Sequence, residues 1–345
     1  MTVFEQAFPV TRRRVLQLLA LLGVGGSALL KAARALAESD EQAADMWPEM
    51  TYRTLGQTGF RGSRLVFGCG AALMFWGKDE LLNEAFERGV NVFDVGTSDY
   101  YRNAEENLAG FAKKHRGEIF LISKGQVGIE VAPGDELSAE QRSTAARNWA
   151  KALDQSLTDL ATDHVDAYYV MAVNNVSLVR SAEMREAFLA AKTAGKVDHW
   201  GISTHQNAQA VLDAMTETAW YSLAQVAVTP AGWYDWSKKE VLAESKPMIG
   251  LRPTLDRARA GGIGLIGMKA GRHLAGRWYG FGLGRPTAFD AHYDPKLLKA
   301  PLSPFQRSYA FVLAHGLDAV NADSQSTAHL RENFIAAATS QSYFA

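Results

Sequence analysis

From Thr51 onward, the sequence alternates between short apolar runs and longer segments of helical period. Near-continuous apolar runs are typical of strands that are buried on both faces of a parallel sheet, and apolar side chains recurring every three or four residues are typical of helices. Eight such strand–helix units predict a (β/α)₈ barrel, with a doubly wound open sheet as the alternative. The predicted strands span residues 64–70, 91–96, 118–125, 164–173, 197–204, 222–230, 262–269 and 317–323.

The connections between these strands are mostly helical. The predicted helices span residues 78–88, 104–115, 139–160, 178–194, 207–215, 253–260, 304–315 and 327–338. The segment 271–303 is too long for an ordinary connection, so we expect it to form a functional loop over one face of the barrel. Trp76, Trp278 and Tyr279 are expected at the mouth of that face, with plain packing as the alternative.

The composition excludes several classes of protein. A chain of 345 residues with a formal net charge of −1 suits one large globular domain, and it has no basic excess that would indicate a nucleic acid partner. The one cysteine, Cys69, rules out an internal disulfide framework and a multi-cysteine metal site. The eight histidines show no metal-binding spacing, so no metal site is predicted.

The N-terminus is expected to be a targeting segment. Arg12, Arg13 and Arg14 precede an apolar run from residue 15 to 30, which is shorter than the roughly 20 residues that span a bilayer. Ala35-Leu-Ala37 then gives a small-x-small cleavage signal. We therefore predict a signal peptide (1–37), a polar linker (38–50) and a barrel (51–345).

Paired arginines before a modest apolar run resemble a twin-arginine signal. The resemblance implies export to the periplasm or beyond by the twin-arginine machinery, a route that carries folded proteins, often with their cofactor already bound. Contact with the membrane is expected only through this N-terminal segment. An uncleaved membrane anchor and a cytoplasmic protein with an amphipathic leader are the alternatives.

One glycine pattern is misleading. Gly262, Gly264 and Gly267 match the spacing G-x-G-x-x-G. A dinucleotide fingerprint needs these glycines in the turn between a strand and a helix, whereas here they fall within a predicted strand. We expect them to allow close approach of backbones, or of a ligand, at the barrel wall.

Chemistry-bearing side chains gather at the carboxyl ends of the predicted strands, where barrels carry their active sites. Asp94 and Lys124 end two successive strands, and Tyr100 and Tyr101 follow Asp94. Alone, Asp94 could cap the next helix and Lys124 could form a structural ion pair. Together they form a proton-donating set, because a buried ammonium is expected to lower the pKa of a phenol and a carboxylate keeps the lysine charged.

At this point the chain resembles the aldo-keto reductase family, from Tyr52 to Ala338. The resemblance rests on YRTLGQTGFRGSRLVFGCG, GVNVFDVG, YRNAEENLAG, EIFLISKG, LDQSLTDLATDHVDAYYV, AGKVDHWGIST, GIGLIGMK and HLRENFIAAA, taken in order. It implies a (β/α)₈ barrel that transfers hydride between NADP(H) and a carbonyl or alcohol substrate. It also implies that Asp94, Lys124 and Tyr101 are catalytic. The Asp-to-Tyr spacing is about two residues longer than usual in the family, so Tyr100 remains a candidate for the acid.

The resemblance also implies a set of cofactor-binding residues. Ser203, Thr204 and Gln225 correspond to the contacts of the nicotinamide amide. From their place after the seventh predicted strand, Lys269 and Arg272 are expected to contact the phosphates, with a solvated rim as the alternative. Ser324, Glu332 and Asn333 correspond to the adenine end. Asp323 would repel the 2′-phosphate of NADP but could accept a hydrogen bond from the 2′-hydroxyl of NAD, so NAD(H) is an alternative.

Three departures from the family pattern put activity in doubt. Met171 stands where the family has a histidine, and methionine has no N–H that could polarise a carbonyl. Val228 stands where an aromatic ring usually stacks on the nicotinamide, and Asp323 alters the phosphate end. The alternative function is therefore a catalytically degenerate barrel that binds a ligand or a protein partner. His205 could face the pocket, but a surface or core position is favoured.

Overall fold

The computed structural model describes residues 47–274 and 284–343. The predicted signal peptide and all but the last residues of the predicted linker lie outside the described residues, as do Trp278 and Tyr279. The unit that begins at Glu49 contains the barrel.

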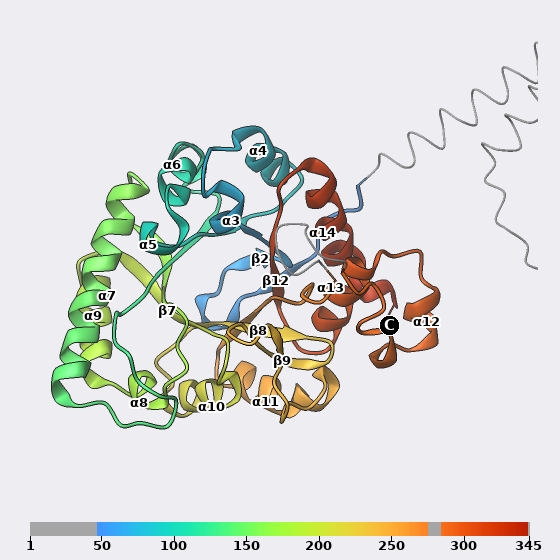
Figure 1. Cartoon of the computed structure of the whole chain (residues 1–345). Coiled ribbons are helices and arrows are strands. Elements are labelled where there is room, and N and C mark those ends of the chain that lie inside the picture. Colours follow the sequence, from blue (N-terminus) through green and yellow to red (C-terminus); the bar gives the residue numbers. More distant parts are fainter. Residues whose placement is uncertain (1–46, 275–283, 344–345) are drawn as a thin grey trace, which may run out of the picture. The chain divides into compact units, whose positions relative to one another are not determined.

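Eight parallel strands close into a barrel, which confirms the predicted fold class (Figure 1). Closure is made by β12 pairing with β3, where Val320 lies opposite Leu65, and by β7 pairing with β8. The eight strands are β3 (Leu65–Gly68), β4 (Val92–Asp94), β5 (Phe120–Gly125), β6 (Val165–Val170), β7 (Val197–Thr204), β8 (Leu223–Thr229), β11 (Gly264–Met268) and β12 (Ala319–Asp323).

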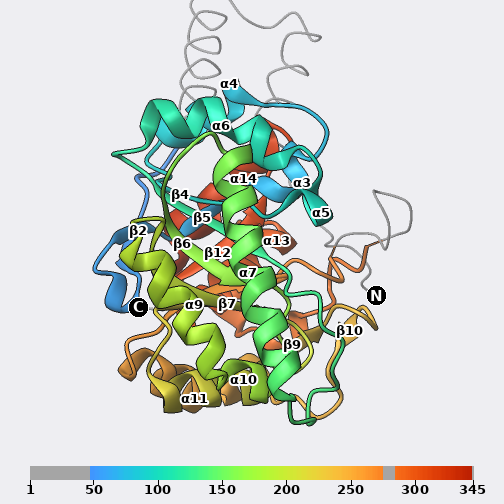
Figure 2. The same ribbon diagram turned by 90° about the vertical axis from the view of Figure 1, so that its left-hand side faces the viewer.

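The helices form an outer layer around these strands (Figure 1). The longer ones are α4 (Asp79–Glu87), α6 (Ala104–His115), α7 (Ala139–Asp159), α9 (Ala182–Thr193), α10 (Ala208–Thr218), α11 (Met248–Ala260), α13 (Pro304–Ala314) and α14 (Thr327–Thr339). Shorter ones are α3 (Cys69–Leu73), α5 (Ser98–Tyr101), α8 (Val176–Val179) and α12 (Pro295–Lys299). Figure 2 shows α7 and α9 packed side by side on one flank. Within the described ranges, no helix has both the length and the apolar character that a membrane span needs.

Two helix predictions were wrong in their bounds. The helix expected to begin at Pro253 begins at Met248, because the buried side chains of Met248 and Leu251 hold an extra turn against the barrel and the helix continues through the proline. The helix expected over 178–194 is broken into α8 and α9, because Ser181 accepts a hydrogen bond from the N–H of Met184 and thereby caps a new helix.

Two hairpins supplement the barrel. The first pairs β1 (Tyr52–Thr54) with β2 (Arg61–Ser63) and lies against the amino ends of the strands, where the N–H of Gln57 donates to the carbonyl of Gly262. The second pairs β9 (Gly232–Asp235) with β10 (Glu240–Val241) and extends β8 beyond its carboxyl end.

The barrel interior is apolar below the carboxyl ends of its strands. The buried cluster consists of Leu55, Val66, Val92, Phe120, Ile122, Ala167, Tyr169, Leu223, Ile266 and Ala319. Leu55 enters it from the first hairpin, and a Cβ on Gly264 would lie 2.7 Å from the carbonyl carbon of Leu55. Gly264 and Gly267 lie inside β11, where a Cβ on Gly267 would clash with the side chain of Leu317. Gly262, which was expected within the same strand, lies in the turn before it. This packed interior leaves the carboxyl ends of the strands as the place for a site.

Candidate active site at the carboxyl ends of the strands

A buried ion pair joins the ends of β4 and β5. Lys124 Nζ lies 2.7 and 2.6 Å from the two carboxylate oxygens of Asp94 and 2.6 Å from the carbonyl oxygen of Val95. Each of the two charged residues is only 4% exposed. Buried charges persist when they are paired and hydrogen-bonded, and this pair meets both conditions.

Two amides complete the environment of Asp94. The side-chain amide of Asn321, on β12, donates to Asp94 Oδ2, and that of Gln225, on β8, donates to the same oxygen at 3.3 Å. The structure therefore brings Gln225 to the ion pair. Asn321 was not predicted from the sequence, although its place as a polar residue within an apolar strand was a usable signal.

Tyr101 is the tyrosine that lies beside this pair. Lys124 Nζ lies 5.8 Å from the centroid of the Tyr101 ring. A Cβ on Gly70 would come within 2.6 Å of that ring and one on Gly96 within 3.0 Å, so both positions need glycine to admit the ring. Tyr100 is 41% exposed and meets Tyr101 edge to face at 4.8 Å between centroids. The geometry thus favours Tyr101 over Tyr100 as the acid.

The expectation that Lys124 lowers the pKa of this phenol was wrong for the structure described. Burial raises the pKa of Tyr101, and the negative charge of Asp94 raises it further. The Tyr101 hydroxyl is therefore protonated throughout the physiological pH range.

The predicted amide contacts meet at the ends of β7 and β8. Ser203 lies opposite Gln225 in the parallel register, and its hydroxyl accepts the N–H of Ala172 at 3.0 Å. Thr204 Oγ1 and Gln225 Oε1 are buried and have no hydrogen-bond partner among the described residues. Buried polar atoms without partners are uncommon in folded proteins and mark places where a ligand atom could bind.

Two of the three departures from the family pattern, Met171 and Val228, are buried. Met171 follows β6 and is 7% exposed, and Val228, within β8, is fully buried. Of the aromatic residues in the adjoining hairpin, Tyr234 packs into a buried cluster with Ala227 and Met268, and Trp236 packs against that cluster. Trp236 is therefore the hairpin ring that remains partly open.

Three cations surround the indole of Trp236. Its ring centroid lies 3.0 Å from Lys239 Nζ, 4.1 Å from Lys269 Nζ and 4.7 Å from Arg272 Cζ. None of these three cations forms an ion pair within the part of the chain that the structure describes. Burial, reinforced by Arg272 and Lys239, lowers the pKa of Lys269 to about 7. Lys269 is therefore only partly protonated at neutral pH, but the cluster still carries positive charge that no ion pair among the described residues balances, and it is suited to an anion.

His205 lies near this cluster, with its ring centroid 6.3 Å from that of Trp236. Burial lowers the pKa of His205 to about 3, and the neighbouring lysines 269 and 239 lower it as well. The imidazole is therefore neutral at any physiological pH and offers one N–H donor at the barrel mouth. This places His205 at the rim of the site rather than at a remote surface.

The last strand brings together the residues predicted for the adenine end. The amide of Asn333 donates to the carbonyl of Asp323 at 3.2 Å and to the hydroxyl of Ser324 at 3.1 Å. The side-chain amide of Gln325 donates a hydrogen bond to the carboxylate of Asp323. The side-chain amide of Gln306 donates a hydrogen bond to the backbone carbonyl of Glu332. Asn333 and Ser324 thus fix the loop between β12 and α14, and beside it Asp323, at the end of β12, is exposed and Glu332, on α14, is half-buried.

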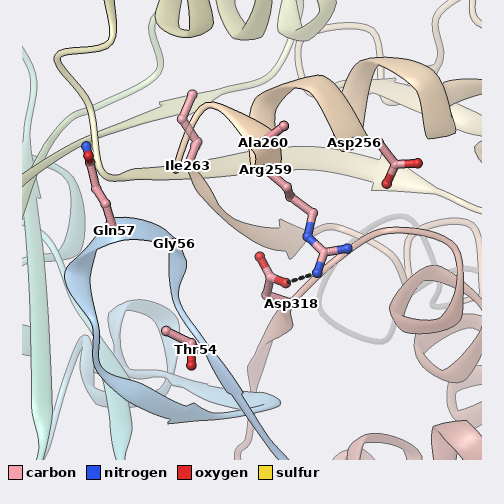
Figure 3. Close-up of a pocket in the computed structure, with 9 residues that line it drawn as sticks. Thr54, Gly56, Gln57, Asp256, Arg259, Ala260, Ile263 and Asp318 are labelled. Carbon is pink, nitrogen blue, oxygen red and sulfur yellow. Dashed lines mark ion pairs between the residues drawn. The ribbon is translucent and has the colours of Figure 1, made fainter.

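A pocket lies at the opposite end of the barrel (Figure 3). It is lined by residues of the first hairpin, such as Thr54 and Gln57, and by the Arg259–Asp318 ion pair at 3.2 Å. Asp318 also accepts the N–H of Leu265, so its carboxylate has structural partners. This pocket is separate from the residues at the carboxyl ends of the strands.

Known proteins match both the sequence and the fold. The sequence model of the aldo/keto reductase family matches residues 76–244, and no curated protein matches the chain. A Pseudomonas aeruginosa protein assigned to the aldo-keto reductases has a TM-score of 0.59 at 19% identity, over 86% of this chain and 98% of its own. An aldo-keto reductase from Klebsiella pneumoniae, solved with NADPH, has a TM-score of 0.57 at 19% identity, over 85% and 90%.

A third similar structure is a thermostable aldo-keto reductase, Tm1743, solved with the inhibitor epalrestat. Its TM-score is 0.55 at 19% identity, over 83% of this chain and 94% of its own. At 19% identity the similar structures show a shared fold only. The match to the family sequence model covers the segment that contains Tyr101 and Lys124. The chain is therefore similar to the aldo/keto reductase family over residues 76–244, just under half of its length, and it shares the barrel fold of the solved members.

Proposed function

We propose that this protein is a nicotinamide-dependent oxidoreductase that transfers hydride between the cofactor and a carbonyl or alcohol substrate. The match of residues 76–244 to the aldo/keto reductase family supports the oxidoreductase class. The observation that carries the proposal is the buried Lys124–Asp94 pair beside the ring of Tyr101. It gives the barrel mouth a phenol that holds its proton and a cation that stabilises negative charge near it.

In this proposal Tyr101 delivers its proton to the oxygen of the substrate as that oxygen becomes an alkoxide. A buried phenol is a weak acid, but a developing alkoxide is a strong base, so the transfer is favourable at the reacting oxygen. Lys124 stabilises the phenolate that remains, and Asp94 keeps Lys124 charged and aligned. Gly70 and Gly96 leave the space that lets the Tyr101 ring lie beside the Lys124–Asp94 pair.

The residues present fit a dinucleotide. A bound nicotinamide supplies or accepts the hydride. Thr204 Oγ1 and Gln225 Oε1, which lack partners among the described residues, suit the donors of its carboxamide. The cations around Trp236 suit its phosphates, because Arg and Lys are the residues that bind phosphate oxygens in proteins. The Klebsiella pneumoniae relative was solved with NADPH, which supports the same cofactor here.

The form of the cofactor depends on Asp323. Family resemblance favours NADP(H). The exposed carboxylate of Asp323, held by Gln325 at 2.8 and 3.0 Å, would repel a 2′-phosphate and favours NAD(H) if the ribose binds there. Titration of the purified protein with NADPH and with NADH decides between them, and Asp323→Asn should raise the affinity for NADPH alone.

We also propose export through the twin-arginine route, with cleavage after Ala37 and a periplasmic or otherwise exported location. The support is the sequence of residues 12–37. Export in the folded state would let the cofactor leave the cytoplasm already bound. Mass spectrometry of the protein from the exported fraction tests both parts, since it reports the mature N-terminus and any co-purifying dinucleotide.

The decisive experiment on activity follows the oxidation of reduced nicotinamide with a panel of aldehydes and ketones. We expect turnover by the wild type and loss of turnover in Tyr101→Phe and Lys124→Met, with cofactor binding retained. Full activity in the doubly substituted Tyr100→Phe/Tyr101→Phe protein would exclude a tyrosine as the acid.

A second candidate function is a barrel that has kept the fold and lost the chemistry. The specific observation is Met171, buried where the family resemblance places a histidine donor. Such a protein would bind a ligand or a partner protein without hydride transfer. Tight binding of NADPH or NADH, seen by fluorescence titration together with turnover, would exclude this candidate.

A further inference from the structure

A buried carboxyl group lies behind the ion pair, outside the barrel wall. Glu105 is the second residue of α6, four residues after Tyr101, and its side chain is inaccessible to solvent. Acidic side chains are seldom fully buried without a charged partner, and no such partner forms an ion pair with Glu105 within the described ranges. Neither the proposed acid–base chemistry nor the proposed cofactor contacts use this group.

Its contacts join the two segments that carry the proposed chemistry. Ser123, the residue before Lys124 on β5, donates its hydroxyl proton to Glu105 Oε1 at 2.5 Å. Successive residues of a strand point to opposite faces, so Ser123 faces the helices while Lys124 faces the barrel interior. Glu105 therefore connects the start of α6, just after Tyr101, with the strand that carries Lys124.

The other oxygen of the carboxyl group is not paired. Glu105 Oε2 is buried and has no hydrogen-bond partner among the described residues. The nearby hydroxyls of Ser156 and Tyr168 hydrogen-bond to each other at 3.1 Å. A carboxylate that has only neutral hydroxyls around it is poorly solvated, whereas a protonated carboxyl is stable in this environment.

We propose that Glu105 is a positioning residue that is protonated when the protein is active. When Glu105 ionises, its negative charge offsets part of the positive charge of Lys124, and Tyr101 becomes a weaker proton donor. This inference rests on the proposed function for its kinetic consequence only. A neutral Glu105 holds Ser123 by a hydrogen bond and leaves the Lys124 ammonium balanced by Asp94 alone. An ionised Glu105 adds a second negative charge on the other side of β5 and disfavours a phenolate at Tyr101.

The charged and titratable groups around Glu105 are consistent with this role. Burial raises the pKa of Glu105 to about 7, the hydroxyls of Ser123 and Ser156 and the charge of Lys124 oppose that rise, and Asp159, on α7, adds to it. Tyr168, on β6, faces the same region, and its own pKa is raised chiefly by burial. The proton of Glu105 therefore exchanges within the neutral range.

The test compares Glu105→Gln with Glu106→Gln, an exposed glutamate one residue away on the same helix. Glutamine keeps the size of the side chain and imitates the protonated form. We expect wild type and Glu106→Gln to lose kcat several-fold as the pH rises from 6 to 8, with little change in KM, and Glu105→Gln to keep its pH 6 value across that range. An unchanged inflection in Glu105→Gln would overturn the proposal, and Lys269, whose pKa is also lowered to about 7, would be the next group to substitute.

A readout that needs no turnover separates this inference from the proposed function. The infrared carbonyl band of a protonated carboxyl should be present at pH 6 in wild type and Glu106→Gln, vanish with a midpoint near 7 and be missing in Glu105→Gln. Absence of the band in wild type at pH 6 would overturn the inference even in an active enzyme. Ser123→Ala should shift the midpoint of the band upward, because the carboxylate then loses the hydrogen bond from the Ser123 hydroxyl.

Discussion

Both carboxylate oxygens of Asp94 accept hydrogen bonds from the ammonium of Lys124, at 2.7 and 2.6 Å. Each of the two residues is only 4% exposed. The two residues lie on neighbouring strands and close the polar layer above the apolar barrel interior. The pair therefore has a structural cost as well as the chemical role that we propose for it, and substitutions can separate the two.

Removing one partner should destabilise the protein more than removing both. Asp94→Asn or Lys124→Met leaves an uncompensated buried charge, and we expect each to lower the free energy of unfolding by about 3–5 kcal/mol. The double variant should lose less unfolding free energy than the two single variants together. Chemical denaturation of the three variants measures this. The exposed Arg252–Asp256 pair, with side chains 46% and 49% exposed, is the control, and Asp256→Asn should cost less than about 1 kcal/mol. If the losses of unfolding free energy at Asp94 and Lys124 simply add in the double variant, the two charges do not stabilise each other and the prediction is wrong.

The two tyrosines should differ in their effect on turnover. Tyr101→Phe removes the hydroxyl beside Lys124 and should lower kcat by about 10²–10⁴-fold, the usual contribution of a general acid. Tyr100→Phe removes a hydroxyl from an exposed ring and should leave kcat near the wild-type value. Steady-state kinetics with one reduced cofactor and one aldehyde is sufficient. The reverse order of effects would assign the acid to Tyr100.

Much of the fold could be predicted because the periodic signals were strong. β7 and α6 have the predicted bounds, 197–204 and 104–115, since each has a long apolar pattern and a definite end. The hairpin of β9 and β10 was missed because its short strands have no apolar alternation, and the start of α11 was misplaced because tertiary burial of Met248 overrode the local effect of a proline.

The candidate site was predictable in its residues and not in its electrostatics. Asp94 and Lys124 could be paired because successive strand ends of a barrel adjoin one another. The pKa of Tyr101 could not be foreseen, because it depends on the distance between Lys124 and Asp94 and on the burial of the ring. Lys239, Lys269 and Arg272 gather around Trp236 from two different loops. This cluster could not be predicted, because no local sequence pattern indicates it.

The cations around Trp236 should control dinucleotide affinity. Lys239→Ala or Arg272→Ala removes a charge that the proposal assigns to the phosphates, and each should weaken binding about 10–100-fold, the worth of a charge-assisted hydrogen bond. Lys238→Ala, an exposed neighbour in the same turn, is the matched control. Binding is measured by fluorescence titration at low and high salt. Equal affinity in all three variants would show that the anion binds elsewhere.

The paired arginines should decide where the protein accumulates. Substituting Arg12, Arg13 and Arg14 together by Lys keeps the positive charge of the leader but removes the arginine pair that the twin-arginine route reads. We expect the full-length protein to remain in the cytoplasm, whereas Lys31→Arg should be exported and shortened like the wild type. Fractionation with mass spectrometry of the N-terminus measures both. Export of the triple variant would exclude the twin-arginine route.

The buried carboxyl of Glu105 should make stability fall as the pH rises towards neutrality. Its pKa is raised from an ordinary 4.5 to about 7 in the folded protein, so between these values the folded state holds a proton that the unfolded state has released. The stabilising contribution is therefore complete below pH 4.5 and is lost as the pH rises through 7. A displacement of this size corresponds to roughly 3 kcal/mol. Glu105→Gln cannot titrate, so its advantage in unfolding free energy over wild type should grow by that amount between pH 4.5 and 8. Glu106→Gln should run parallel to wild type throughout, and parallel curves for Glu105→Gln as well would show that Glu105 is ionised in the folded protein.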